Sequence, residues 1–383
     1  MGRGKLVVVV DDRRGSLAAQ FRRFAEMETH GASPLYERLA HGVAEDSDLL
    51  ALAAKGRPEQ PAPNLLFASV HLLLLDGARH ELAGFYPSVT ASPVRGDPLP
   101  AFRDFCREHA DAITGMLHER RVQTNVVERC GLLLPAFGIV ARRNGGKPLH
   151  LVEVGASAGL NLLWDRYWFD YGDGRQCGDT SSPVRIETAL RGGGEPPLPP
   201  QLPAVGARTG IDLNPIDVRA AGAVQWLRAL VWPEEREQLR RLDSAVALAR
   251  EDPPTVLAGD ALDLLPGVLG RATHGAALCV FHTHTLNQFS PEARRQFDAL
   301  LADVGARRDL YWLSSEYRPV EGGGMRPTLT LATFEEGKRD EQVLAYCDHH
   351  GRWLEWLAEG RVTRPQKGGA GGKASSRSSR YSM

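Results

Sequence analysis

Five short apolar runs alternate with stretches of helical periodicity in the second half of the chain, and this alternation constrains the fold more than any other feature. The runs are LHLVEVG, ARTGIDL, TVLAGD, AALCVFHT and DLYWLSS. Strands that alternate with helices are joined by crossovers, which produce a mostly parallel sheet with helices on both faces. Ligands bind beyond the carboxyl ends of the strands in such sheets, so the residues that follow each run are the functional candidates.

The first part of the chain shows only helical patterns. The expected helices begin near Ser16 and at Ser33-Pro34, cover Leu65–Leu75 and Ala101–Leu117, and run from about Gln123 to Val140. A proline in the first turn, as at Pro34, is typical of a helix start. We therefore expect a helical N-terminal cap domain over residues 1–145 and an α/β domain over residues 146–363.

Three segments of the second half depart from the alternating pattern. Residues 170–207 contain GDG, GGG and PPLPP, which favour an inserted hairpin and loop with a short strand at Val184–Leu190. A final helix is expected at Trp353–Leu357. The basic tail over residues 364–383 is rich in Gly, Ser, Lys and Arg and is expected to be disordered, because it has little apolar surface to bury.

Charge and cysteine content exclude several classes of protein. The 383 residues carry a formal net charge of −1, so no overall attraction to nucleic acid or to an anionic membrane is expected. The five cysteines are scattered and never form C-x-x-C, which argues against a disulfide framework or structural zinc and favours a reducing cytosol. The apolar run Leu6–Val10 is too short for a signal peptide or membrane span. A cytoplasmic protein is expected, and the oligomeric state stays open.

The segment Leu151–Asn161 contains the most specific motif in the chain. An apolar strand ends at Glu153, a turn of small residues follows, and a helix is expected after Gly159. Gly155 and Gly159 would let the backbone approach a ligand closely, and the helix start would offer free N–H groups. The alternative is a tight strand–helix joint that binds nothing.

Two aspartates follow the next two strands. Asp212 could accept hydrogen bonds from the ribose hydroxyls of a nucleoside, and the insertion at residues 170–207 would explain its long separation from Glu153. The alternative for Asp212 is a turn or capping residue before Pro215. Asp260 could accept a hydrogen bond from the exocyclic amine of an adenine, or could cap the following helix, or both.

His282 and His284 follow the fourth strand and would share one face of it. A metal pair is conceivable, but no acidic or cysteine ligand lies nearby in the sequence, so no metal site is expected. A histidine at this edge is better interpreted as a general base or a group that orients substrate. A structural, hydrogen-bonded histidine is the alternative.

A second polar cluster precedes the sheet. Gln123, Thr124 and Asn125 are expected on the first turn of a helix, among Arg121, Glu128 and Arg129, where they could face a ligand together. A solvated helix end is the alternative. Tyr36, Asn64 and His71 are further candidates to line a pocket between the domains, although each alone is more often a satisfied core polar group.

The motifs EVGASAG, GIDLNP, GDALDLLP and VFHTHT resemble, in this order, those of class I S-adenosylmethionine-dependent methyltransferases over about Leu149–Glu316. The resemblance implies a Rossmann-like, methyltransferase-type sheet, with the Gly155–Gly159 turn against the methionine part of the cofactor, Asp212 on the ribose and Asp260 near the adenine. Those enzymes usually have glycine where this chain has Ser157. The whole chain, from SPLYERLA and PNLLFASVHLLLL through RRVQTNVVERC to HGRWLEWL, also resembles an uncharacterised bacterial family, domain of unknown function 2332, which carries no established reaction.

These observations lead to an expected function. It is methyl transfer from S-adenosylmethionine to a small molecule bound between the domains, with Gln123 and Asn125 orienting the acceptor and His282 or His284 removing its proton. Two alternatives stay open. One is a methyltransferase-fold enzyme that performs another transfer, a cyclisation or an elimination without the cofactor. The other is a non-catalytic protein that binds a ligand or partner.

Overall fold

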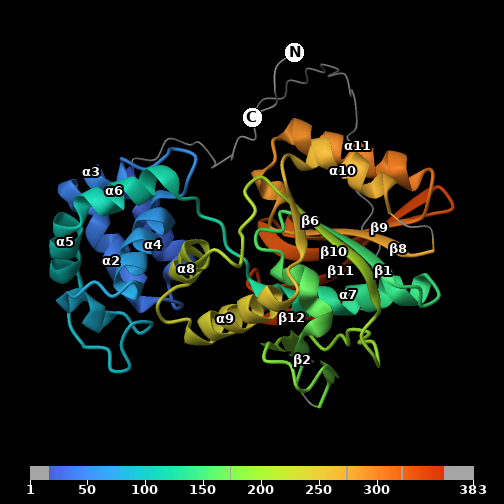
Figure 1. The fold of residues 1–383 in the computed structure, drawn as a ribbon, viewed down its shortest axis with the longest axis horizontal. Coiled ribbons are helices and arrows are strands. Elements are labelled where there is room, and N and C mark those ends of the chain that lie inside the picture. The colour runs from blue at the N-terminus through green and yellow to red at the C-terminus, as the bar shows by residue number, and fades with distance from the viewer. Residues whose placement is uncertain (1–16, 173, 273–274, 321, 358–383) are drawn as a thin grey trace, which may run out of the picture.

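The computed structural model describes residues 17–172, 174–272, 275–320 and 322–357. One group of helices lies on the left of Figure 1, and a sheet flanked by helices lies on the right. The Leu6–Val10 run and the basic tail expected over residues 364–383 fall outside the described residues. No helix in the described ranges is long and apolar enough to cross a membrane.

The first described element is α1, and only helices follow it as far as residue 143. They are α1 (Leu17–Arg23), the π-helix η1 (Phe24–Thr29), α2 (Pro34–Ala44), α3 (Ser47–Ala53), α4 (Ala62–Leu75), η2 (Glu81–Phe85), α5 (Leu99–Glu108), α6 (Ala110–Glu119), η3 (Val127–Arg129) and α7 (Cys130–Arg143). Side-chain caps fix two of the helix starts: Ser33 Oγ accepts the Tyr36 N–H, and Asp46 accepts the N–H groups of Asp48 and Leu49. The helical expectation for this part of the chain is confirmed for the described residues.

A nine-stranded sheet forms the second half. Its strands are β1 (Leu149–Val154), β5 (Ala189–Arg191), β6 (Val205–Asp212), β7 (Thr255–Ala258), β8 (Ala277–Thr283), β9 (Leu310–Pro319), β10 (Met325–Glu335), β11 (Lys338–Cys347) and β12 (Trp353–Trp356). They lie in the order β5-β12-β11-β10-β9-β8-β1-β6-β7. Strands β7, β6, β1, β8 and β9 are parallel neighbours and correspond to the five apolar runs. The protein is therefore a mixed α/β fold with a large, mostly parallel sheet.

Helices cover both faces of this sheet. The α7 side chains pack on one face with Leu149 and Leu151 of β1, whereas α10 (Ala261–Gly270) and α11 (Pro291–Gly305) pack on the other face with Val152 and Val154. This alternation along β1 is the two-residue period of a strand, and every β1 residue is buried. A strand covered on both faces has a near-continuous apolar sequence, as β1 has.

The insertion builds a small sheet of its own. β2 (Trp168–Asp170), β3 (Gln176–Gly178) and β4 (Arg185–Glu187) form three strands in the order β3-β2-β4, while β5 joins the large sheet beside β12. The helix expected at Trp353–Leu357 is wrong, because this segment is β12. Leu354 and Trp356 are buried while Trp353 and Glu355 are only half-buried, and pairing with β11 and β5 fixes the extended backbone.

The helix expected from Gln123 also begins later than predicted. Residues 120–126 form no helix, and the 3-10 turn η3 precedes α7, which starts at Cys130. We call residues 120–126 the linker. Its polar side chains form hydrogen bonds to the loops of the sheet, as described below, rather than to the helix that follows.

The apolar cores do not follow the boundary expected at residue 145. Helix α7 packs in the core of the sheet, whereas Trp226, Ala229 and Leu230, at the end of α8 (Ala221–Ala229), pack in the core of α1 to α6. The Trp226 Nε1–H also donates to the Arg121 carbonyl at 2.7 Å. We call α1 to α6 with α8 the helical lobe. The α/β lobe comprises the sheet with α7, α9 (Arg236–Glu251), α10 and α11.

If α8 completes the helical lobe, Trp226→Ala should lower the free energy of unfolding by about 3–5 kcal/mol, because it leaves a cavity in that core. The half-buried Trp353 on β12 is the matched control, and Trp353→Ala should cost clearly less. Guanidinium unfolding measures both. Equal losses in the two variants would contradict the assignment of α8 to the helical core.

Candidate functional site

The turn after β1 has a left-handed backbone at three positions. The φ angles are +77° at Gly155, +56° at Ser157 and +73° at Gly159. A side chain in this region costs about 1–2 kcal/mol, which glycine avoids. Ser157 therefore adopts a backbone conformation that glycine reaches without this cost.

Protein atoms, rather than open space, lie against the two glycines of this turn. A Cβ on Gly155 would lie 2.3 Å from Thr285 Oγ1, and one on Gly159 would lie 2.7 Å from Pro254 Cγ. Both positions thus require glycine for packing. The loop after β8 that carries Thr285 lies directly on the turn after β1.

The Asp212 carboxylate joins three segments at the end of β6. Its Oδ2 accepts the Ser157 N–H at 2.8 Å, and its Oδ1 accepts the Asn214 N–H at 2.8 Å and the Gln123 Nε2–H at 3.1 Å. A carboxylate has about four acceptor positions, so one position on Oδ2 is left for a further donor. The half-buried side chain thus holds the glycine turn and the linker while keeping room for one more hydrogen bond.

Asn125 holds the other end of the same turn. Its buried Oδ1 accepts the N–H groups of Ala158 and Leu160, each at 3.2 Å. Gln123 and Asn125 therefore bind Asp212 and the glycine turn, at Ala158 and Leu160, on the sheet side of the linker.

Glu153 lies at the base of the turn and is completely buried. The Asn161 Nδ2–H donates to its Oε1 at 3.1 Å, whereas Oε2 has no partner within the described part of the chain. Burial raises the pKa of this carboxyl well above its usual value. The Ser157 hydroxyl, also buried, likewise has no partner among the described residues. Two unsatisfied polar groups therefore lie at the carboxyl end of β1.

Asp260 caps α10, since its Oδ1 accepts the Leu262 N–H at 2.9 Å. Its second carboxylate oxygen keeps its acceptor positions. Leu213, directly after Asp212, is an exposed apolar side chain at 48%. Sequence reasoning missed Leu213, although a large apolar residue inside the polar turn IDLNP was a usable signal.

His282 is a structural histidine in this geometry. It is fully buried against α11, its Nδ1–H donates to Glu316 Oε1 at 2.8 Å, and its Nε2 accepts the Trp312 indole N–H at 3.0 Å. The expectation that His282 and His284 share a face is wrong. Strand β8 ends at Thr283, and His284 has a left-handed φ of +52° that breaks the alternation.

His284 lies on the opposite side from His282, at the edge of the sheet. Its ring packs against Tyr317 and His349, with centroid separations of 5.5 and 6.4 Å. Its Nε2 is buried and has no partner among the described residues. Burial and the nearby Arg129 guanidinium lower the pKa of His284 to about 3, so the imidazole is neutral at physiological pH. A strained backbone and an unpaired buried nitrogen are typical of a functional position.

Arg129 lies behind these rings. Its Nε–H donates to the His349 carbonyl at 2.9 Å, and its Nη1–H donates to Thr283 Oγ1 at 3.4 Å. Burial lowers the pKa of the guanidinium, while Glu316, Glu128 and Glu153 oppose this shift. The fixed positive charge keeps the neighbouring imidazoles neutral.

A cavity of about 290 Å³ lies between the two lobes. We call it the interlobe cavity; its walls come from η1, α2, α4, the linker, the end of α8, α9 and the ends of β9 and β11. They comprise Met27, Glu28, Tyr36, Asn64, Ala68, Val122, Thr124, Val126, Ala229, Leu230, Val231, Trp232, Gln238, Tyr317, His349 and His350.

Of the expected pocket residues, Tyr36 and Asn64 line this cavity. His71 does not, because its Nδ1–H donates to the Ala229 carbonyl and its Nε2 accepts the Ser88 hydroxyl. Gln123, Asn125 and His282 do not line it either, so the structure does not bring Asn125 and His282 together there.

The linker separates this cavity from the glycine turn. Val122, Thr124 and Val126 line the cavity, whereas Gln123 and Asn125 bond Asp212 and the turn. Alternate residues of an extended chain point to opposite sides, which explains this division. The linker therefore contacts the interlobe cavity on one side and the glycine turn on the other.

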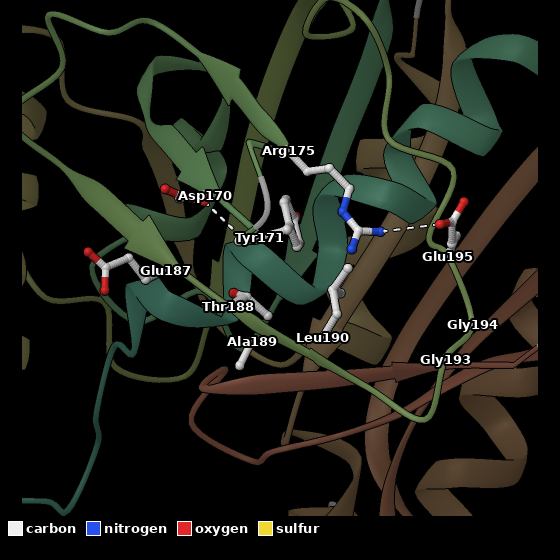
Figure 2. Close-up of a pocket in the computed structure, with 11 residues that line it drawn as sticks. Asp170, Tyr171, Arg175, Glu187, Thr188, Ala189, Leu190, Gly193, Gly194 and Glu195 are labelled. Carbon is white, nitrogen blue, oxygen red and sulfur yellow. Dashed lines mark hydrogen bonds and ion pairs between the residues drawn. The ribbon is translucent and has the colours of Figure 1, made fainter.

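A larger hollow of about 650 Å³ lies in the insertion (Figure 2). Its polar groups bond within the protein: Arg175 pairs with Glu195 at 3.8 Å, Thr188 Oγ1 donates to the Gly351 carbonyl, and Tyr171 Oη donates to the Gly131 carbonyl. None of its described lining side chains is buried without a partner. We therefore place the candidate site at the sheet edge and the interlobe cavity.

Among described residues, no group of three or more His, Cys, Asp or Glu side chains is arranged to hold a metal ion. All five cysteines are buried free thiols.

Comparison with known proteins supplies a family but no activity. Neither the curated proteins nor the solved structures gave a match. One family model matches residues 18–356, nearly the full length of the chain. The chain belongs to the bacterial family described as "Uncharacterized protein conserved in bacteria (DUF2332)".

Proposed function

We propose that the protein is an S-adenosylmethionine-dependent methyltransferase that acts on a small molecule. The observation that carries this proposal is the meeting of the Gly155–Gly159 turn and the Asp212 carboxylate beside the point where the strand order reverses. The five parallel strands lie in the order third, second, first, fourth, fifth along the chain. Doubly wound sheets with this order bind nucleotides outside the carboxyl ends of the strands, at the reversal. Here the reversal falls between β1 and β8.

The residues at this edge fit the cofactor. Asp212 keeps one acceptor position for a ribose hydroxyl, and exposed Leu213 beside it offers an apolar surface for a purine. Asp260 has a free carboxylate oxygen for the adenine amine. The turn, with the unsatisfied Ser157 hydroxyl and Glu153 Oε2, would hold the polar methionine part. When bound, the cofactor supplies an electrophilic methyl group.

His284 is the residue we assign to orienting the acceptor, in place of His282. Its neutral imidazole has an unpaired Nε2 that can accept a hydrogen bond from the acceptor, whereas both nitrogens of His282 are occupied. Its position between Thr285, which lies on the glycine turn, and Tyr317, which lines the interlobe cavity, links the two sites. The helical lobe closes the cavity from the other side and limits access of water.

One observation favours a second candidate, an enzyme of this fold that works without the cofactor. The Gln123 amide occupies one acceptor position on Asp212, and Thr285 packs on Gly155. Under this alternative these contacts are permanent, whereas under our proposal Gln123 moves or shares Asp212 when the nucleoside binds. The calorimetric titration with S-adenosylmethionine described next separates the two candidates.

S-adenosylmethionine and its demethylated product should bind with micromolar affinity, and Asp212→Asn should weaken both by tenfold or more. A hydrogen bond to a charged acceptor contributes about 1.5–3 kcal/mol, and the amide can still accept the Ser157 N–H. Asp217→Asn is the matched control, because it removes an exposed carboxylate from the same segment. Isothermal calorimetry measures the affinities. Absence of heat with both ligands at saturation would reject the proposal and favour the alternative.

The His284 imidazole should stay neutral from pH 5 to 8, because burial and Arg129 hold its pKa at about 3. Arg129→Met removes the nearby positive charge and should raise that pKa, while burial keeps it below the ordinary 6.5. Nitrogen-15 NMR of labelled histidine reports the protonation state directly, and His284→Asn identifies the resonance because Asn tolerates a left-handed backbone. A midpoint near 6.5 in the unmodified protein would contradict the assigned environment.

A further inference from the structure

We propose that the interlobe cavity binds a small amine whose ammonium group pairs with Glu28 and whose apolar body lies against the aromatic rings of the cavity. This inference goes beyond the proposed function and does not rest on it, because the linker separates the cavity from the turn at which the cofactor would bind. Binding of the amine requires neither the cofactor nor Asp212, so the two ideas can fail separately.

Charge selects the class of ligand. Among the described residues that line the cavity, Glu28 carries the only formal charge, and no lysine or arginine lines it. Burial lowers the pKa of His349, and it lowers that of His350 to about 3, so both imidazoles are neutral. A single carboxylate among neutral groups favours a cation of compact size.

Aromatic rings form much of the remaining wall. Tyr36, Trp232 and Tyr317 line the cavity with the two histidines, and Trp232 contacts His350 edge-on at 6.2 Å. The face of an aromatic ring attracts a positive charge. Leu230, Val231 and Val126 complete an apolar surface for the rest of the molecule. At about 290 Å³ the cavity lies at the lower end of small-molecule sites, so the ligand is small.

An unsatisfied polar group indicates that the cavity is built for a ligand. Tyr36 is only 3% exposed and lines the cavity, yet its hydroxyl has no partner among the described residues. Buried polar groups normally have partners, so each exception requires an explanation. A bound molecule with donor and acceptor atoms supplies one.

The π-helix η1 places Glu28 at the cavity mouth. It carries both Met27 and Glu28, which are exposed there, and π-helical turns are frequent at functional sites. Partial burial raises the pKa of Glu28, while Arg23 on α1 and a hydrogen bond from Asn64 lower it. An ammonium group that binds there would pair with this carboxyl and favour its ionised form.

Arg129 is the charge that opposes this assignment. It lies behind His349 and Tyr317, and its effect on both side chains shows that it is near the cavity. Its Nε–H is directed to the His349 carbonyl, however, and it does not line the cavity. Asp348 and Glu28 act on Tyr317 in the opposite direction. The one carboxyl that lines the cavity is therefore not matched by a lining arginine or lysine, and binding of an anionic ligand is an outcome that the test can detect.

The test compares three probes of similar size in calorimetric titrations of the full chain without cofactor. Phenethylamine is the cation, phenethyl alcohol the neutral analogue and phenylacetate the anion. The amine should bind about tenfold more tightly than either analogue. Glu28→Gln should remove this preference and leave alcohol binding unchanged, while Glu26→Gln, an exposed carboxylate on the same π-helix, should leave both unchanged.

The dependence on pH provides a second readout. Amine affinity should fall as pH decreases toward and below the raised pKa of Glu28, because the protonated carboxyl no longer attracts the ammonium group. The Glu28→Gln protein should lack this dependence. Tighter binding of phenylacetate, equal affinity in wild type and Glu28→Gln, or no binding of the amine at millimolar concentration would each overturn the proposal. Asp212→Asn should bind phenethylamine normally, which separates this result from the test of the cofactor site.

Discussion

The Asp212 carboxylate is the interaction on which the arrangement of the site depends. Three segments that are far apart in the sequence meet on it: the turn after β1 through the Ser157 N–H, the linker through Gln123, and the turn after β6 through Asn214. Hydrogen bonds to a charged acceptor are stronger than neutral ones, so this junction is stiff. The left-handed turn and the extended linker are both conformations that would not persist without such external support.

Once the linker is fixed at Gln123 and Asn125, the two-residue period of an extended chain determines where its other side chains point. The side chains between and beside these two must face the other way, and there they form a wall of the interlobe cavity. Because the same short segment contacts both sites, a shift of the glycine turn would move Thr124 and Val126 as well. The segment is thus shared by the turn after β1 and the wall of the interlobe cavity.

Sequence reasoning captured the features that depend on local pattern. Five apolar runs became the five parallel strands, and the turn after Glu153 and the acid after the second strand lie where parallel topology places them. It failed where distant pairing overrides local preference. Trp353–Trp356 was expected to be helical, but its backbone pairs with β11 and β5 and is therefore a strand. The side of the sheet on which His284 lies depends on a single positive φ, which no periodicity reveals.

The exchange of helices between the lobes has a consequence for the order of folding. The core of the helical lobe includes Trp226, Ala229 and Leu230, which follow β1 and β6 in the chain. Domains generally fold in sequence during synthesis, from the N-terminus onward. The core of the helical lobe cannot be completed in this order, because α8, which contacts α4, is made only after β1 and β6. Part of the sheet is therefore translated before this core is complete.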